Sequence, residues 1–421
     1  MPGVVRAGDR VTLVPEKAAA GGRMLARHGG FVILVAGAIP GEPVVAHVER
    51  VEKSLAFATV VDVIDPHPDR RPVGFDPRCG GAVLAHVGPD LQRRLKGDML
   101  RDALARIGRI DVGGPIEVVP SPEEGYRMRA RLHLRGGRLG FFLEGTHEVC
   151  DAAVTRQLAD EAAESILVLA DRLAAGGLRA DADIELAENR PGDQRALHVQ
   201  VAQRGALGLW SAFEPVAGVT GLTWAPAHVG GERLVYGRPF VEDVVRGARL
   251  RRHARAFFQG NRFLLDALVD AVVEACQPGP VLDLYAGVGL FGVTLAASGH
   301  DRVVCVEGHP ASAADLRANA APYGDAVVVE EAAVERLVTR RPPGGAFTLV
   351  LDPPRTGMTR EAAAGAVAMG AARVVFVSCD VATFARDVRR FLDGGYRLES
   401  LRAFDLFPNT AHVESLAVLA H

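Results

Sequence analysis

The chain has few long hydrophobic runs. Its uninterrupted apolar stretches, such as Phe31 to Ile39, fall far short of the roughly 20 residues that a membrane span needs. The N-terminus, Met1 to Arg6, has no basic start followed by an apolar stretch, so no signal peptide is expected. We therefore expect a cytoplasmic protein with no membrane partner.

Cysteine and lysine are also scarce. Five cysteines, at positions 79, 150, 276, 305 and 379, are scattered along the 421 residues and odd in number. In a cytoplasmic protein this argues against a disulfide framework and leaves catalysis, metal binding or packing. Lysine occurs only at 17, 53 and 96, so nearly every positive charge is arginine. A net charge of −3 gives no global sign of nucleic-acid binding, so the local distribution of charge must decide.

The length predicts two or three domains. Residues 1–64 read as short strands separated by Gly and Pro turns, which predicts a small OB-like β-barrel. Such barrels commonly bind nucleic acid, so we expect RNA binding here; the alternative is a small β domain without that function. Residues 65–250 begin with a proline-rich linker and continue as a mixed α+β central domain, also expected to bind RNA. Within it, residues 91–117 are expected to pack on the catalytic domain. The expected barrel strands are Arg10–Val14, Arg23–Arg27, Phe31–Val35, Val44–Val51 and Ala56–Ile64.

From about residue 251 to 421, apolar β-branched segments alternate with helical patterns. This alternation predicts an α/β domain with a doubly wound, Rossmann-like parallel sheet, whose ligands bind at the carboxyl ends of the strands. The expected strands are Val281–Leu284, Arg302–Glu307, Thr348–Leu351 and Val374–Ser378, and the expected helices include Ala311–Ala321 and Val381–Leu392.

A glycine-rich turn follows the first of these strands. Gly287, Gly289 and Gly292 satisfy G-x-G-x-x-G, and Glu307 ends the next strand, where an acid can bind a ribose. Dehydrogenases and methyltransferases both use this arrangement. Asp283, close to the turn, would repel a pyrophosphate but suits the cationic S-adenosylmethionine, so a methyltransferase is favoured over a dehydrogenase.

Two further strands end in residues suited to chemistry. Asp352 is followed by Pro353 and Pro354, which fix the backbone at the rim of the cofactor crevice. Cys379 lies where the next strand ends and a helix begins, a position that stabilises a thiolate. Asp380 opposes this effect unless its carboxylate caps the helix.

A glutamate opens the last apolar strand. If that strand, expected to include Leu416 to Ala420, begins at His412, then His412 and Glu414 share a face. Burying a carboxylate there costs free energy unless the group is paired or functional. Glu414 is therefore either in an ion pair with an arginine or a general base. Thiolate addition to C6 of uracil activates C5 for methylation, and a base then removes the C5 proton. Cys379 and Glu414 suit these two roles, and Asp352 can hold the polar edge of the base.

Together these motifs resemble the uracil-C5 RNA methyltransferase family, in the branch with an N-terminal TRAM domain. The resemblance implies a class I methyltransferase domain and S-adenosylmethionine as cofactor. It implies Cys379 as nucleophile, Glu414 as base, and a cofactor and base site formed by Gln259, Tyr285, Gly287, Gly289, Glu307 and Asp352. The matching segments are Phe258-Gln259-x-Asn261, Asp283-Leu284-Tyr285-x-Gly287-x-Gly289, Asp352-Pro353-Pro354-Arg355-x-Gly357, Ser378-Cys379, Phe407-Pro408-x-Thr410-x-His412-Val413-Glu414, Tyr126-Arg127-x-Arg129-Ala130 and the turn Leu34 to Glu42.

The chain departs from the family in three places. Leu290 stands where Asn is frequent, and Asp380-Val381 stands where Asn-Pro commonly follows the cysteine. Many members hold a [4Fe–4S] cluster with four cysteines, three of them spaced C-x5-C-G-x-C. Here Val73 and Ala82 replace two of these, and only Cys79 and Cys150 remain, so we expect neither an iron–sulfur cluster nor another metal.

The RNA partner is less defined than the chemistry. The TRAM-bearing branch often acts on ribosomal RNA, so rRNA is expected as substrate and a monomer as the active form. The alternatives are a tRNA uracil-C5 methyltransferase of the same mechanism and an inactive RNA-binding relative. From Tyr126 to Arg135, basic and other residues alternate strictly, which predicts a half-buried strand with one cationic face. We expect Arg127, Arg129 and Arg131 on this face to contact RNA rather than to protect an edge strand by charge.

Overall fold

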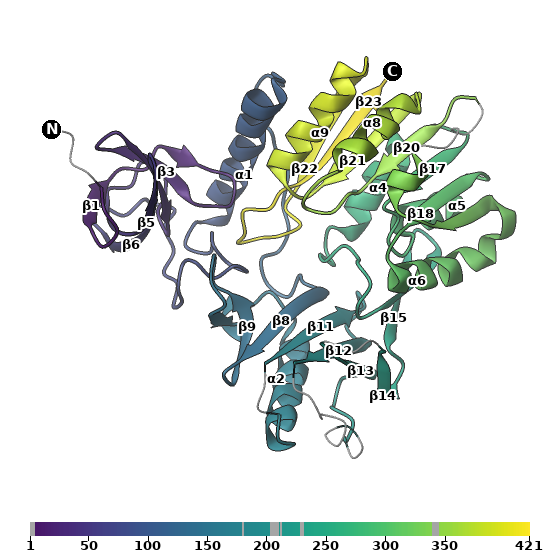
Figure 1. The fold of residues 1–421 in the computed structure, drawn as a ribbon, viewed down its shortest axis with the longest axis horizontal. Helices are drawn as coiled ribbons and strands as arrows, with labels where there is room; N and C mark the ends of the chain where they lie inside the picture. Colours follow the sequence, from purple (N-terminus) through teal and green to yellow (C-terminus); the bar gives the residue numbers. More distant parts are fainter. Residues whose placement is uncertain (1–4, 179–180, 203–209, 211–212, 228–230, 339–344) are drawn as a thin grey trace.

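The computed structural model describes residues 5–178, 181–202, 210, 213–227, 231–338 and 345–421. Within them, three groups of strands follow one another along the chain, a small N-terminal sheet, a central sheet and a C-terminal α/β layer structure (Figure 1). No described helix is both long and apolar enough to cross a membrane.

Residues 10–63 form a strongly curved, barrel-like sheet of six strands in the order β1-β5-β6-β4-β3-β2. Its interior is lined by small and branched residues such as Ala26, Ile33 and Val48, each with no exposed surface. Five strands agree with the sequence prediction; β2 was not predicted because two residues show no alternation. The strands are β1 (Arg10–Leu13), β2 (Lys17–Ala18), β3 (Met24–His28), β4 (Phe31–Ala36), β5 (Val44–Glu52) and β6 (Leu55–Val63).

The central region holds a seven-stranded sheet in its described residues, in the order β10-β9-β8-β11-β12-β13-β14. Helix α2 covers one face, where Ile166 and Leu169 share a core with Leu132, Ile184 and Leu197. The elements are β8 (Arg129–Arg135), β9 (Arg138–Phe142), β10 (Val149–Asp151), α2 (Asp160–Ala175), β11 (Ala182–Glu188), β12 (Arg195–Val201), β13 (Gly221–Pro226) and β14 (Arg233–Gly237), followed by a hairpin of β15 (Phe240–Val245) and β16 (Ala248–His253).

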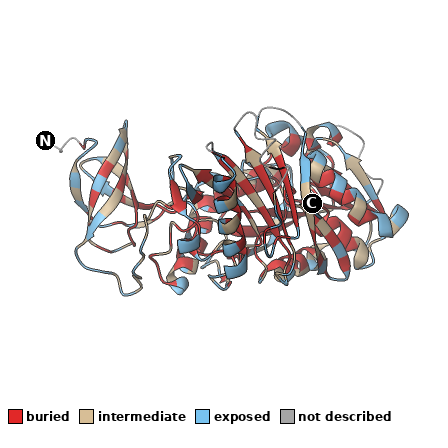
Figure 2. Ribbon diagram, turned by 90° about the horizontal axis from the view of Figure 1, so that it is seen from below, coloured by how far each residue is buried: buried red, intermediate tan, exposed pale blue. Residues whose placement is uncertain are grey.

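The C-terminal part is doubly wound, as predicted. Its sheet has the order β19-β18-β17-β20-β21-β23-β22-β7. Successive strand residues enter opposite cores, since Leu349 and Leu351 pack with α8 and α9 while Val350 packs with α4, α5 and α6. Figure 2 shows buried residues running through this sheet. The elements are α4 (Leu265–Ala275), β17 (Val281–Leu284), α5 (Leu290–Ala297), β18 (Val303–Glu307), α6 (Pro310–Ala320), β19 (Val327–Glu331), α7 (Val334–Leu337), β20 (Thr348–Leu351), α8 (Arg360–Ala368), β21 (Arg373–Ser378), α9 (Val381–Asp393), β22 (Arg397–Phe404) and β23 (Glu414–Ala420).

Residues 89–119 connect the parts. Helix α1 (Pro89–Ala103) continues into a π-helical turn (Leu104–Gly108) that packs on α9, and β7 (Val118–Val119) joins the catalytic sheet beside β22. Lys96, fully buried on α1, donates to Asp405 Oδ1 at 2.5 Å and to the carbonyl oxygen of Phe407 at 2.9 Å. Because residues 405–410 lead into β23, α1 fixes the approach to Glu414.

Candidate active site

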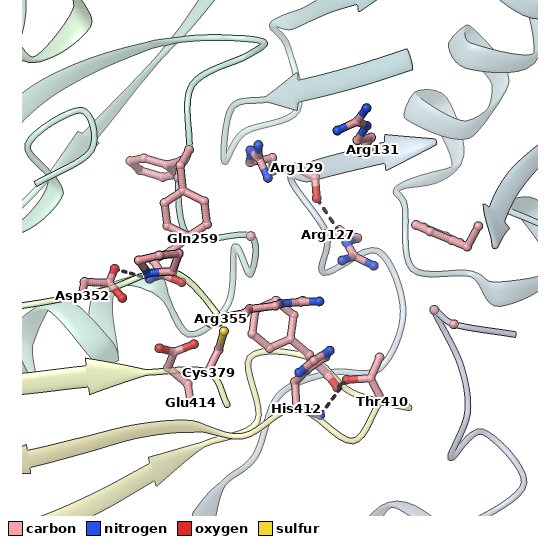
Figure 3. Close-up of a pocket in the computed structure, with 18 of the residues that line it drawn as sticks. Arg127, Arg129, Arg131, Gln259, Asp352, Arg355, Cys379, Thr410, His412 and Glu414 are labelled. Atoms are coloured by element: carbon pink, nitrogen blue, oxygen red, sulfur yellow. Dashed lines mark hydrogen bonds between the residues drawn. The ribbon is translucent and has the colours of Figure 1, made fainter. Parts of the chain in front are cut away.

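Three strands bring chemical side chains to one edge of the catalytic sheet. Asp352 follows β20, Cys379 follows the parallel neighbour β21, and Glu414 begins β23, which pairs with β21 at Ser378 and Ser415. All three line one pocket of about 360 Å³. In Figure 3, the Cys379 sulfur lies between Arg355 and Glu414, with Gln259 and Asp352 beside them. The sheet register thus brings together residues that lie far apart in the sequence.

Cys379 lies immediately before helix α9. Asp380 caps this helix, since its Oδ1 accepts from the backbone N–H of Ala382 at 3.1 Å and of Thr383 at 2.8 Å. Its carboxylate is therefore used in capping, as the sequence argument required. Burial raises the pKa of Cys379 to about 12, the charge of Glu414 acts in the same direction, and Arg355 opposes both. The resting side chain is a neutral thiol, and Arg355 is the cation that favours its ionisation.

Glu414 is buried to 1 % exposure, and neither of its carboxyl oxygens finds a hydrogen-bond partner among the described residues. Burial raises the pKa of Glu414 well above its ordinary value, and the neighbouring Asp352 raises it further. Burial also raises the pKa of Asp352 to about 7, although Gln259 Nε2 donates to its Oδ2 at 3.0 Å and lowers it. The ion pair considered as an alternative for Glu414 is absent from the described residues, which leaves a carboxyl group free for a ligand.

Three arginines of the alternating segment, Arg127, Arg129 and Arg131, line the same pocket. Arg127 Nε donates to the carbonyl oxygen of Arg129 and Arg129 Nε to that of Ala256, each at 3.1 Å. Burial lowers the pKa of both side chains. The alternate residues Tyr126, Met128, Ala130, Leu132 and Leu134 are all buried, as the predicted half-buried strand requires.

The neighbours of this strand bear on the charges of its cationic face. Strand β8 lies between β9 and β11, so it is not an edge strand. Its cationic face is also not left without an anion: Asp183 on β11 accepts from Arg131 and Arg135 at 2.6 Å and lies 2.9 Å from His133 Nδ1. This carboxylate comes from a strand about 50 residues away along the chain. The contact of Arg127, Arg129 and Arg131 with RNA stays a prediction.

A second hollow of about 550 Å³ adjoins the first across Phe257, Asp352 and Arg355. Tyr285, Gly287 and Glu307 line it. Glu307 Oε2 accepts from the N–H of Gly287 at 2.8 Å and its Oε1 from the N–H of His309 at 2.6 Å, so the carboxylate is held at the crevice. This carboxylate suits a ribose diol, and together with Asp352 it disfavours a pyrophosphate. The crevice lined by Tyr285, Glu307 and Asp352 therefore fits S-adenosylmethionine.

Three residues near the glycine turn have other positions than expected. Gly289 does not line the crevice; with φ +91° it begins α5, and an added Cβ would lie 2.5 Å from Val293 and 2.7 Å from Leu316. Gln259 lines the first pocket rather than the crevice. Asp283 is fully buried beneath the turn, where its Oδ2 accepts from the N–H of Gly292 at 2.9 Å. Burial raises the pKa of Asp283 to about 8, so it supports the turn instead of facing a cationic ligand.

Comparison with known proteins identifies the reaction. The sequence profile of the family described as tRNA (Uracil-5-)-methyltransferase matches residues 345–421. An uncharacterized RNA methyltransferase of Streptomyces coelicolor is 32 % identical, over 98 % of this chain and 93 % of its own length. The 23S rRNA (uracil(1939)-C(5))-methyltransferase RlmD of Halomonas elongata is also 32 % identical, over 98 % and 90 %. The chain belongs to the uracil-C5 RNA methyltransferase family.

This uracil-C5 RNA methyltransferase is therefore an S-adenosylmethionine-dependent enzyme that acts on RNA. Its fold agrees with that of the tRNA (uracil-54, C5)-methyltransferase of Pyrococcus abyssi, solved with S-adenosyl-L-homocysteine. That structure matches with a TM-score of 0.77 at 24 % identity, over 97 % of this chain and 99 % of the other. Membership of the uracil-C5 RNA methyltransferase family excludes the dehydrogenase interpretation of the glycine turn.

The structure also revises the interpretation of the cysteines of this methyltransferase. Cys79 and Cys150, for which no disulfide was expected, are joined as one, with their Cα atoms 5.8 Å apart. The reason lies in strand pairing: Cys79 pairs with Leu143 beside the β9–β10 hairpin that carries Cys150. No group of side chains suited to a metal ion occurs in the described part of the chain.

Sequence reasoning gave no role to several other residues that line the first pocket, among them Arg355, Phe257, Thr410 and His412. Arg355 is the most consequential, because it acts on the pKa of both Cys379 and Glu414. One feature of the sequence could have indicated Arg355: it directly follows Asp352-Pro353-Pro354, at the end of strand β20. Phe257, 50 % exposed, had no comparable signal, since only the fold brings it to the ridge between the two hollows.

Proposed function

We propose that this enzyme forms 5-methyluridine in ribosomal RNA, with Cys379 as nucleophile and Glu414 as general base. The observation that carries the proposal is the pairing of a half-buried thiol with a buried carboxyl group that has no partner among the described residues, in a pocket that also holds four arginines. Evolution rarely leaves such a carboxyl group unpaired without a use, because its burial costs free energy.

The chain's own residues support each step of this reaction. The Cys379 thiol first gives its proton to solvent. The thiolate sulfur then bonds to C6 of uracil, and the π electron pair of the C5–C6 double bond moves toward O4. Arg355 favours the thiolate that this step requires. When bound, S-adenosylmethionine supplies the methyl group that C5 accepts. Burial favours the protonated form of Glu414 in the empty pocket, so this group acts as base only after it has released that proton to solvent. The Glu414 carboxylate then takes the C5 proton, and the released electron pair expels the Cys379 thiolate and restores the C5–C6 double bond.

Residues of both hollows are assigned to binding. Tyr285, Gly287, Glu307 and Asp352 hold the cofactor, with Gly289 shaping the turn from behind and Gln259 orienting Asp352. Arg127, Arg129 and Arg131 contact the RNA backbone near the target. The barrel of residues 1–64 and the central region of residues 65–250 form the rest of the RNA-binding surface, and residues 251–421 form the catalytic domain.

Ribosomal RNA is favoured because a relative that is named for 23S rRNA matches nearly the whole chain. Transfer RNA is the second candidate, because the matching family profile bears a tRNA name. Mapping 5-methyluridine in both RNA classes, from cells with and without the gene, distinguishes them. A site that is lost from rRNA supports the proposal, and a site that is lost only from tRNA contradicts it.

The covalent mechanism is tested separately with RNA that contains 5-fluorouridine at the mapped position. That base has no C5 proton for Glu414 to remove, so the enzyme should remain attached through Cys379 in a complex that survives denaturing electrophoresis. Failure of the wild-type enzyme to form this complex while it still methylates the natural RNA would refute the covalent mechanism.

A further inference from the structure

A third hollow, of about 180 Å³, lies beside the nucleophile. It shares Gly80, Cys379, Thr410 and His412 with the substrate pocket, so the two hollows adjoin. All three parts of the molecule contribute to its wall. The lining residues are Ala20 and Gly21 from the barrel, Gly80, Val83 and Glu144 from the central region, and Cys379 to Val381 and Thr410 to His412 from the catalytic domain.

The walls of this hollow are fixed by close contacts. A Cβ added to Gly22 would lie 2.9 Å from Val83 and 3.0 Å from Ala411, so the β2–β3 turn fits tightly against both neighbours. Arg23 Nε donates to both carboxylate oxygens of Glu144, at 2.9 and 3.1 Å, and joins the barrel to the central region. The hollow is thus built into the fold rather than left between loosely placed domains.

Its chemistry differs from that of the substrate pocket. None of its described lining residues is Arg or Lys, so it disfavours a phosphate group. Glu144 is paired with Arg23, whereas the bonds by which Asp380 caps α9 all go to Oδ1, so Oδ2 is the carboxylate oxygen that the cap does not use. Burial lowers the pKa of His412 to about 4, and nearby Arg355 adds to this effect, so the ring between the two hollows is neutral. A neutral aromatic ring beside small apolar residues is a suitable surface for a nucleobase, and a carboxylate accepts hydrogen bonds from an exocyclic amino group.

We propose that this hollow receives the base of a nucleotide adjacent to the target uridine, and that Asp380 selects a base with an exocyclic amino group over uracil. The inference depends on the proposed reaction at Cys379, because an uracil held there places its neighbours in the RNA strand next to the hollow. It gives the enzyme a means of choosing one uridine by its sequence context, in addition to the arginines that hold the backbone.

The test uses the stem-loop that contains the mapped uridine, synthesised with 5-fluorouridine at that position and all four bases at each adjacent position. RNA trapped covalently by wild type, Asp380→Asn, Ala20→Trp and Val61→Trp is sequenced. Asn keeps an oxygen that caps α9 but replaces the carboxylate. Ala20 lies on an exposed turn, so Trp fills the hollow from outside the catalytic residues. Val61, 48 % exposed on β6 and outside the hollow, is the matched control.

Wild type and Val61→Trp should enrich adenine, cytosine or guanine over uracil at one adjacent position by about fivefold or more, the range for one good base contact. Asp380→Asn and Ala20→Trp should lose this enrichment. An equal base composition in wild-type adducts, or unchanged enrichment in Asp380→Asn or Ala20→Trp, would overturn the inference while leaving the reaction at Cys379 intact. If wild type traps no RNA at all, the covalent mechanism fails and the inference fails with it.

Discussion

Glu414 and Asp183 are both carboxylates set among arginines, yet their surroundings are opposite. Asp183, on the central sheet, accepts hydrogen bonds from Arg131 and Arg135 and contacts His133. Burial alone would raise the pKa of Asp183, but these hydrogen bonds hold it well below the usual range. Glu414, at the edge of the catalytic sheet, has no partner among the described residues, and burial raises its pKa. A fully bonded charge such as Asp183 therefore stabilises the fold, whereas a buried carboxyl group without a partner, such as Glu414, indicates a site that a substrate completes.

The largest effect is expected at the nucleophile. Cys379→Ala should lower methyl transfer by roughly 10³-fold or more, as losing a nucleophile commonly does. The affinity for S-adenosylhomocysteine, measured by calorimetry, should not change, because the thiol does not line the cofactor crevice. Substantial methylation by a folded Ala variant would mean that another residue attacks C6.

Glu414→Gln should allow the covalent adduct to form but slow its resolution by roughly 10²-fold, the lower range for removing a general base. Denaturing electrophoresis with unmodified RNA should then show an adduct that wild type does not accumulate. Asp183→Asn is the matched control, because it also replaces a carboxylate near arginines but lies outside the reaction. Normal turnover by the Glu414 variant without trapped RNA would require a different base.

The sequence predicted the C-terminal α/β sheet more fully than the central sheet. Strands 281–284 and 348–351 were predicted with the ends that the structure has, because buried parallel strands are continuous apolar runs bounded by turns. That Cys379 and Glu414 would lie at one pocket could be predicted because ligands in this fold bind at strand ends. Asp183 could not be found, since pairing between β8 and β11 is set by the tertiary fold and no local pattern records it.

The same limit explains the other errors. The disulfide partner of Cys79 depends on how residues 79–82 lie along a hairpin some 60 residues later. Gly289 satisfied a motif whose spacing cannot say which glycine faces the ligand and which one packs behind it. The motif predicted the glycine turn correctly, whereas no motif predicted the hairpin near Cys79. For both Gly289 and Cys79, the packing of distant segments decided what the residue contacts.

A smaller effect is expected on RNA affinity. The double change Arg129→Ala, Arg131→Ala should weaken RNA binding and reduce the log–log salt dependence by roughly 0.7–0.9 for each phosphate that the protein no longer neutralises. Cofactor affinity should not change. Arg138→Ala, an exposed arginine on β9 outside the pocket, is the control. If RNA affinity and its salt dependence both stay at wild-type values in the folded double variant, Arg129 and Arg131 do not contact RNA and have a structural role in the central sheet.

The smallest effect concerns stability, and it has opposite signs at the two carboxylates. Asp183→Asn should lower stability by ~1–3 kcal/mol at pH 7, the range for losing charge-assisted hydrogen bonds. Because folding lowers the pKa of Asp183, its contribution is present above the unfolded value of about 3.9 and is lost as the pH falls below it. The difference in melting temperature between wild type and this variant should therefore close in acid.

For Glu414 the sign reverses. Folding raises the pKa of Glu414. Above the unfolded value of about 4.3, the folded state therefore keeps a proton that the unfolded chain releases. This difference in bound protons lowers the free energy of unfolding as the pH rises. Glu414→Gln removes that cost, so the variant should melt above wild type at pH 7 and together with it near pH 4. Differential scanning calorimetry of both variants across this range measures both signs. If Glu414→Gln melted below wild type at pH 7, the carboxyl group would have a structural partner, and the contrast with Asp183 would not hold.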